Sequence, residues 1–197
     1  MSRSSGTTGT SGTTGTSGIP STFDPDTVFA PLRGLRVRDI LLPGFIDRDR
    51  PLPWFQPMPH AVYFAPDEAD DGYVRVADVP DEGQLTLCRV AEPSWPPQLA
   101  DLEGDEFAVG SCGTDHLGTD GHALPLTRVR YALDEVSDRL PGAFRCAEFT
   151  FGPARVFLDP MNYFGIRIQG AAGYEECLTA RRTRTDLGPV REHTWTP

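Results

Sequence analysis

The densest strand-forming pattern in the chain lies between Ala143 and Gln169. From Phe164 to Gln169, apolar residues alternate with polar residues or glycine, a period of two that is typical of a half-buried antiparallel strand. Upstream, the pairs Gly152-Pro153 and Asp159-Pro160 follow two further apolar runs and are turn signals. We therefore predict a meander of three antiparallel strands in this region.

Shorter alternating or apolar runs predict further strands along the chain. The pair Asp71-Gly72 ends a polar link between two of these runs and indicates a hairpin. The pair Pro43-Gly44 is expected to end the first predicted strand. The predicted strands cover residues 35–41, 60–64, 73–76, 85–90 and 107–109.

The segment Thr127–Leu140 fits two structures. Its apolar residues recur at the spacing of an amphipathic helix, which Pro141-Gly142 would end. The first of them also alternate with Arg128 and Arg130, as in a strand. We expect a helix over at least residues 133–140, and the pattern leaves the first part of the segment open.

Composition changes at both ends of the chain. Residues 1–22 contain GTTGTS twice, at Gly6–Ser11 and Gly12–Ser17, and such small polar residues bury too little surface to offset the loss of backbone entropy. We expect a flexible tail there, one globular β-rich domain over residues 23–178, and a mobile end over residues 179–197.

These patterns together predict a mainly β (α+β) protein of 197 residues. Antiparallel strands would form one or more sheets in a meander-like sandwich or barrel, with one short helix and a disordered N-terminal tail. The globular part is long enough to bury a core of its own.

The chain is acidic, with a net charge of −10 and a pI near 4.8. General binders of nucleic acids or of anionic membranes need clustered positive charge, so we expect neither partner here. A basic protein is the favoured partner. All 18 basic residues are arginine, which excludes mechanisms that require lysine, such as a P-loop phosphate site or a Schiff base.

Four cysteines are spread along the chain without a CxxC pair, so a structural zinc site or a redox motif of that kind is not indicated. We expect buried thiols in a reducing compartment. The N-terminus lacks an apolar signal region, and no apolar stretch is long enough to cross a bilayer. These features predict a cytoplasmic protein.

The polar, glycine-rich stretch at residues 111–122 carries the best candidates for chemistry, because it gathers several acidic, histidine and thiol side chains. A metal would take His116, His122 and Asp120, and a catalytic role would fall to Asp115, Asp120 or Cys112. The spacing matches no known ligand motif, so an ordinary surface loop remains the simpler interpretation and no cofactor is expected. No GxSxG, HExxH, P-loop or GxGxxG motif occurs in the chain.

Two proline-rich loops carry tryptophan. Trp54 and Phe55 lie among the prolines of residues 51–60, and Trp95 lies in a second such loop at residues 91–98. Prolines at this spacing favour an extended loop and oppose a central strand or a helix. The aromatic side chains are either anchors packed on the core or an exposed binding lip.

Two functional hypotheses follow. The leading one is a non-enzymatic acidic protein-interaction module that binds a basic partner through Trp54, Phe55 and Trp95, as an immunity or inhibitor protein or as a small component of a larger assembly. The alternative is a metal-assisted hydrolase built on the loop from Cys112 to His122. The sequence does not indicate an oligomeric state.

Overall fold

The computed structural model describes residues 23–49, 51–68, 72–95, 106–118, 121–161, 165–184 and 188–197, and the tail expected at residues 1–22 lies outside them. The strands are β1 (Arg36–Asp47), β2 (Trp54–Pro57), β3 (Ala61–Pro66), β4 (Tyr73–Val79), β5 (Gln84–Val90), β6 (Glu106–Ser111), β7 (Leu124–Leu133), β8 (Cys146–Phe151), β9 (Ala154–Pro160), β10 (Ile166–Gln169) and β11 (Arg191–Trp195). The helices are α1 (Pro25–Val28), a 3-10 turn (Ala30–Leu32), α2 (Gly113–Leu117), α3 (Glu135–Arg139) and α4 (Gly173–Thr183).

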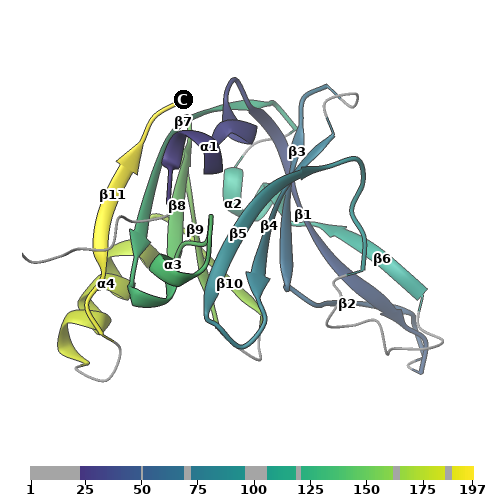
Figure 1. The fold of residues 1–197 in the computed structure, drawn as a ribbon. Coiled ribbons are helices and arrows are strands. Elements are labelled where there is room, and N and C mark those ends of the chain that lie inside the picture. Colours follow the sequence, from purple (N-terminus) through teal and green to yellow (C-terminus); the bar gives the residue numbers. More distant parts are fainter. Residues whose placement is uncertain are drawn as a thin grey trace, which may run out of the picture.

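All strands of the described chain join one antiparallel sheet (Figure 1). The main order is β10-β9-β8-β7-β1-β3-β4-β5, with β11 beside β7 and with β2 and β6 on opposite sides of β1. The mainly β, antiparallel fold predicted from the sequence is therefore confirmed.

The sheet curves until its two halves face each other. Leu85 on β5 exchanges two backbone hydrogen bonds with Phe144, just before β8, at 2.7 and 2.9 Å. On the other side, the N–H of Ile166 on β10 donates to the carbonyl of Pro59, just before β3, at 2.6 Å. These bonds bring strands distant along the sheet together and give the body a barrel-like form.

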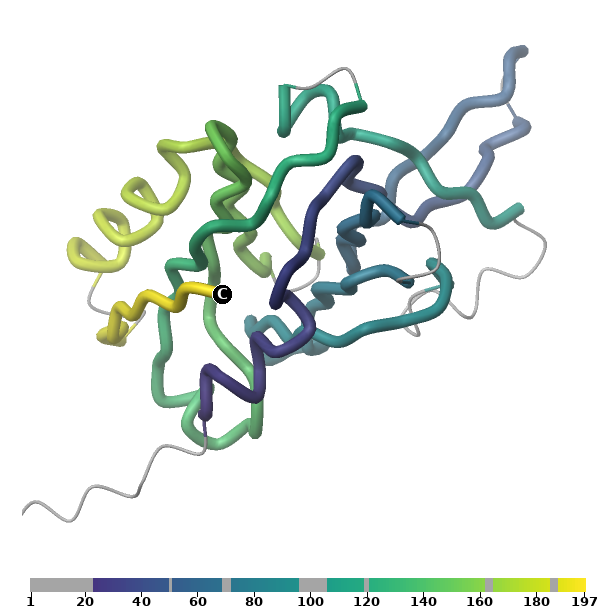
Figure 2. Tube along the Cα trace, turned by 90° about the horizontal axis from the view of Figure 1, so that it is seen from above, coloured from purple at the N-terminus to yellow at the C-terminus, as the bar shows by residue number. Residues whose placement is uncertain are grey.

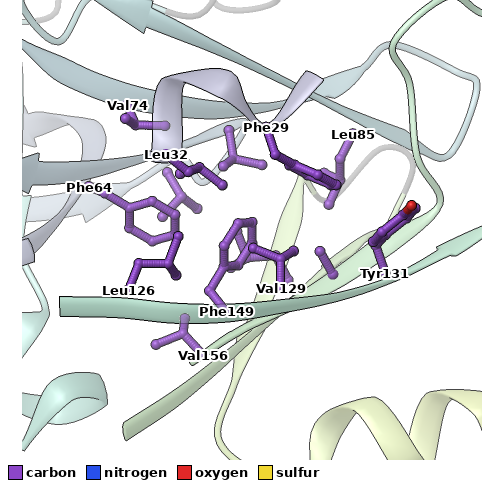
Figure 3. Close-up of a cluster of buried hydrophobic side chains, with 14 of the residues drawn as sticks. Phe29, Leu32, Phe64, Val74, Leu85, Leu126, Val129, Tyr131, Phe149 and Val156 are labelled. Atoms are coloured by element: carbon purple, nitrogen blue, oxygen red, sulfur yellow. The ribbon is translucent and has the colours of Figure 1, made fainter. Parts of the chain in front are cut away.

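The core fills the space between the two halves (Figure 3). Phe64 on β3 meets Phe149 and Phe151 on β8, with ring centroids 5.0 and 5.1 Å apart. Phe29 and Leu32, near the N-terminal helical turns, are fully buried against the same cluster. Edge-to-face contacts of this kind add to the stabilisation from apolar burial.

The predicted meander is confirmed by the successive pairing of β8 with β9 and of β9 with β10. The turn predicted at Asp159-Pro160 was wrong, because these two residues are the end of β9 and pair with Arg167 and Ile166 of β10. Phe164, the first residue of the predicted third strand, lies outside the described residues. The strands predicted from residue 60 to residue 90 form β3, β4 and β5, each paired antiparallel with the next. These elements could be predicted because each carries its own local pattern.

The expected end of the first strand at Pro43-Gly44 was wrong, because β1 continues to Asp47. The carbonyl of Pro43 accepts a hydrogen bond from Met58 N at 2.9 Å, in the segment that joins β2 to β3. Along a strand the nitrogen and carbonyl of one residue point to the same side, so the missing N–H of Pro43 falls at this junction between two partner strands. The strand tolerates proline there.

The proline-rich loop is also more ordered than expected, because Trp54–Pro57 forms β2. This strand pairs with β1 alone among the described strands. Proline is compatible with such an edge position, where part of the backbone faces away from the ladder. The sequence argument against a central strand is consistent with this placement.

The ambiguous segment contains both predicted structures in succession. Strand β7 runs to Leu133, and α3 follows immediately after Asp134. The Asp134 carboxylate accepts from the N–H groups of Val136 and Ser137, each at 3.0 Å, and so caps the helix. A helix is present where it was expected, but its predicted bounds of 133–140 were wrong, because α3 spans only Glu135–Arg139 and Leu133 ends β7.

The mobile C-terminal end expected from residue 179 was wrong. Helix α4 continues to Thr183, and β11 pairs with β7 along its whole length. Trp195 is buried beside Phe29, and its indole N–H donates to Asp26 at 3.1 Å. The polar composition of this segment did not indicate its order, because the segment is fixed by one buried tryptophan and by backbone pairing.

Within the described residues, none of the helices has the length and apolar character that a bilayer crossing requires.

Candidate functional site

Three strand segments extend away from the body of the protein. They are residues 42–47 of β1, together with β2 and β6, and we refer to them as the β-arm (Figures 1 and 2). The outer edges of β2 and β6 pair with no further strand in the part of the chain that the structure describes. Within the described residues the β-arm is therefore a single layer, whereas the strands of the body face one another across the core.

Pairing places the aromatic residues of the β-arm on known faces. In an antiparallel sheet, directly paired residues point to the same side and neighbours along a strand alternate. Phe45 pairs with Phe107, and Trp54 pairs with Asp47, two residues along from Phe45. Val109 lies two residues from Phe107, so these apolar side chains share one side.

Trp95 belongs to the same surface. Its ring lies 5.1 Å from that of Phe107, although the two residues come from different segments. We call Phe45, Trp54, Trp95, Phe107 and Val109 the aromatic face of the β-arm. The structure thus brings together Trp54 and Trp95, which the sequence had singled out separately.

Phe55 lies on the opposite side of the β-arm, because it pairs with Ile46. A Cβ atom added to Gly44 would lie 2.7 Å from the Phe55 ring, and one added to Gly110 would lie 2.3 Å from it. The ring occupies the space that the missing side chains leave. Phe55 is half-buried by this packing, and the arrangement makes it an anchor between β2, β1 and β6.

The aromatic face is open to solvent. Trp54 is 58% exposed and Val109 is 37% exposed, while Phe45, Phe107 and Trp95 are only partly buried. Scattered exposed apolar residues are common, but several gathered on one side of a single-layer sheet are typical of an interaction surface. Tryptophan is also the residue most enriched among those that dominate binding energy.

Acidic residues occur in the segments that form the aromatic face or adjoin them. Asp47 points to the same side as Trp54, Glu92 is exposed in the loop that carries Trp95, and Asp49 is exposed at the end of β1. Arg48 forms an ion pair with Glu106 on the opposite side. This distribution makes the surroundings of the aromatic face more suited to a basic than to an acidic partner.

The stretch at residues 111–122 is not a simple loop. Ser111 ends β6, and Gly113–Leu117 forms α2, with Leu117 buried in the core. Asp39 Oδ1 accepts from Ser111 Oγ at 2.9 Å and from Gly113 N at 3.0 Å. The Asp39 carboxylate thus holds the start of the 111–122 stretch against β1.

The candidate residues of this stretch do not form a common site in the described part of the chain. The Cys112 thiol donates to the carbonyl of Ile40 at 3.4 Å, and burial, with the charges of Asp39 and Asp115, raises the pKa of Cys112 to about 12. Such a thiol is protonated at neutral pH and is a poor nucleophile. Burial also lowers the pKa of His116.

Of the remaining candidates, His122 is exposed and Asp120 lies outside the described residues. Among the residues that are described, no three His, Cys, Asp or Glu side chains are close enough to hold a metal ion together. The nearest concavity has a volume of about 160 Å³, below the roughly 300 Å³ at which sites for small molecules usually begin. It is lined by Arg38, Asp39, Ser111, Thr114 and Gly121.

A buried pair that the sequence did not indicate lies at the start of β3. His60 Nδ1 is 2.8 Å from Asp78 Oδ2, and the two side chains are only 12% and 4% exposed. Burial raises the pKa of Asp78, while the hydrogen bond with His60 opposes that rise. The backbone N–H of Asp78 also donates to the carbonyl of His60, so the pair fastens β3 to β4.

Comparisons with protein-family models, with curated proteins and with solved structures found no match. Function is therefore inferred here from the residues and the geometry of the β-arm. The sequence did not indicate Phe45, Phe107 and Val109 as surface residues of a binding site, although residues 107–109 were predicted as a strand. Their alternation was visible, but nothing local shows whether another layer covers them.

Proposed function

We propose that the protein is a non-enzymatic interaction module that binds a basic partner protein through the aromatic face of the β-arm. The observation that carries the proposal is the exposure of Trp54 on a single-layer sheet beside further aromatic side chains. Burying these side chains against a partner removes apolar surface from water at about 25 cal/mol per Å². Because the strands already order them, little conformational entropy is lost on binding.

Charge supports the choice of a basic partner. The chain carries 28 acidic residues against 18 arginines, and acidic residues occur in the segments that form the aromatic face or adjoin them. Complementary charge mainly raises the association rate and the specificity against acidic proteins, and it adds less to the affinity itself. An inhibitor of a basic toxin and a small subunit of a larger assembly both meet this description.

The test uses Trp54→Ala with Met161→Ala as the matched control. Met161 is also an exposed large apolar residue, at 40%, and it lies outside the β-arm. The native protein and both variants are used to capture proteins from the source cell, and the captured partner is purified. Its affinity for each form is then measured by calorimetry at two salt concentrations.

We expect a basic partner that the native protein and Met161→Ala bind equally. Trp54→Ala should bind about 30-fold more weakly or worse, the loss expected when a central tryptophan worth at least about 2 kcal/mol is truncated. The measured affinity should be lower at the higher salt concentration, because salt screens the attraction between opposite charges. Equal binding by Trp54→Ala, or an acidic partner, would contradict the proposal.

A further inference from the structure

Two cysteines that are distant in sequence meet beneath α4. Cys146 lies on the outer face of β8 and is completely buried, and Cys177 lies on the inner side of α4 with 7% exposure. They belong to one apolar cluster with Phe157 and Tyr174, and their thiols are hydrogen-bonded to each other. Neither thiol is engaged in a disulfide.

Positive charge surrounds the pair. Arg145 adjoins Cys146 in the chain, and Arg181 lies one helical turn after Cys177 on the buried side of α4. The nearest acid, Asp159, is bound by Arg145 at 2.8 Å and by Arg167 at 2.6 Å, so much of its charge is compensated. Arg181 also faces a carboxylate, that of Asp134 at 4.0 Å, so the thiols have two cationic neighbours whose charge is partly compensated.

The two thiols have different roles in this environment. The hydrogen bond from Cys146 lowers the pKa of Cys177, against burial and the charge of Asp159, which raise it, while Arg145 and Arg181 add smaller lowering effects. The same hydrogen bond and burial raise the pKa of Cys146. Cys177 also keeps 7% of its surface exposed whereas Cys146 has none, so Cys177 is the thiol that an oxidant reaches first and Cys146 is its buried partner.

We propose that Cys146 and Cys177 are an oxidation site at which hydrogen peroxide forms a reversible disulfide between β8 and α4. The Cys177 thiolate attacks one peroxide oxygen, the O–O bond breaks, and the departing hydroxide takes up a proton to become water. The resulting sulfenic acid is attacked by the Cys146 sulfur, the S–O bond breaks, and a second water leaves. The two sulfurs lose two electrons in total and the peroxide gains them.

The other two cysteines serve as internal references. Cys88 is exposed on β5 and has no cysteine beside it among the described residues, whereas Cys112 is held as a protonated thiol by Ile40. Exposure alone would make Cys88 the most reactive thiol. The proposal instead assigns disulfide formation to the buried pair.

The full chain is treated with hydrogen peroxide, unfolded, alkylated and digested, and its cysteine peptides are identified by mass spectrometry. A Cys88→Ser variant is treated in parallel to exclude bridges between molecules. We expect one cross-linked peptide pair containing Cys146 and Cys177, lighter by two hydrogen atoms and released by dithiothreitol. Amide hydrogen exchange in α4 should slow by about tenfold or more in the oxidised form, because the helix is then tied to the sheet.

Recovery of Cys146 and Cys177 as alkylated thiols would overturn the proposal. A disulfide that includes Cys88 or Cys112, or a Cys177 that proceeds to sulfinic acid, would overturn it equally. These outcomes come from the native chain and do not require a folded variant. Cys177→Ser provides a second test, because the proposal predicts that Cys146 in this variant is recovered as an unmodified thiol after the same peroxide treatment.

Discussion

The body and the β-arm of this protein are both built from aromatic-rich antiparallel strands, but the aromatic side chains are buried in the body and exposed in the β-arm. Both consist of antiparallel strands with aromatic residues on one face. In the body, Phe64 and Phe149 have no exposed surface, because two halves of the sheet face each other. In the β-arm, Trp54 is 58% exposed, since its sheet is a single layer. An aromatic strand residue stabilises the fold where a second layer covers it and is available for binding where none does.

The largest expected effect is in the body. Phe149→Ala removes a ring that contacts two other buried rings, so we expect a loss of about 3–5 kcal/mol in the free energy of unfolding. Urea denaturation followed by circular dichroism measures this loss. A loss below about 1 kcal/mol would mean that the two halves are not packed as described.

A smaller loss is expected where β1 meets β2. A Cβ atom at Gly44 would lie 2.2 Å from the backbone oxygen of Gln56, so Gly44→Ala forces the strands apart and should cost about 1–3 kcal/mol. Gly170→Ala is the matched control, because a Cβ there meets nothing within 4 Å. Faster amide exchange confined to β2 in Gly44→Ala checks the prediction, and equal behaviour of the two variants would refute it.

The contrast between binding and stability is tested most directly at Trp54. If the aromatic face serves binding rather than stability, Trp54→Ala should change the free energy of unfolding by no more than about 0.5 kcal/mol. The same denaturation experiment as for Phe149→Ala gives the value. A loss of several kcal/mol would show that Trp54 is part of the structural core and would remove the basis for the binding proposal.

A gradual pH effect should come from Asp78. Burial raises its pKa from the ordinary value of 3.8, so the folded protein keeps a proton that the unfolded chain has already lost. The stabilisation from this carboxyl is therefore complete below pH 3.8 and is lost as the pH rises through the folded pKa. Unfolding free energies of the native protein and of Asp78→Asn, compared between acidic and neutral pH, should show this decline only in the native protein. A relative gain in stability with rising pH would contradict it.

Much of the body could be predicted because its information is local. The meander of β8, β9 and β10 shows alternation, and Gly152-Pro153 separates its first two strands, whereas Asp159-Pro160 belongs to β9. The helix after β7 could be placed because Pro141-Gly142 follows it. The position of Trp54 and Trp95 on one surface could not be derived, since it depends on the contact of Trp95 with Phe107 and on the register of β1 with β2 and β6.

The chain's own residues determined that it would be acidic, lysine-free and built mainly from antiparallel strands, because charge and alternation are properties of neighbouring residues. Tertiary structure decided which faces are covered, why β1 continues through Pro43-Gly44, and how the end of the chain is held by Trp195. It also brought Cys146 to Cys177. These outcomes depend on contacts between segments far apart in the chain, and no local pattern records what a folded neighbour will cover.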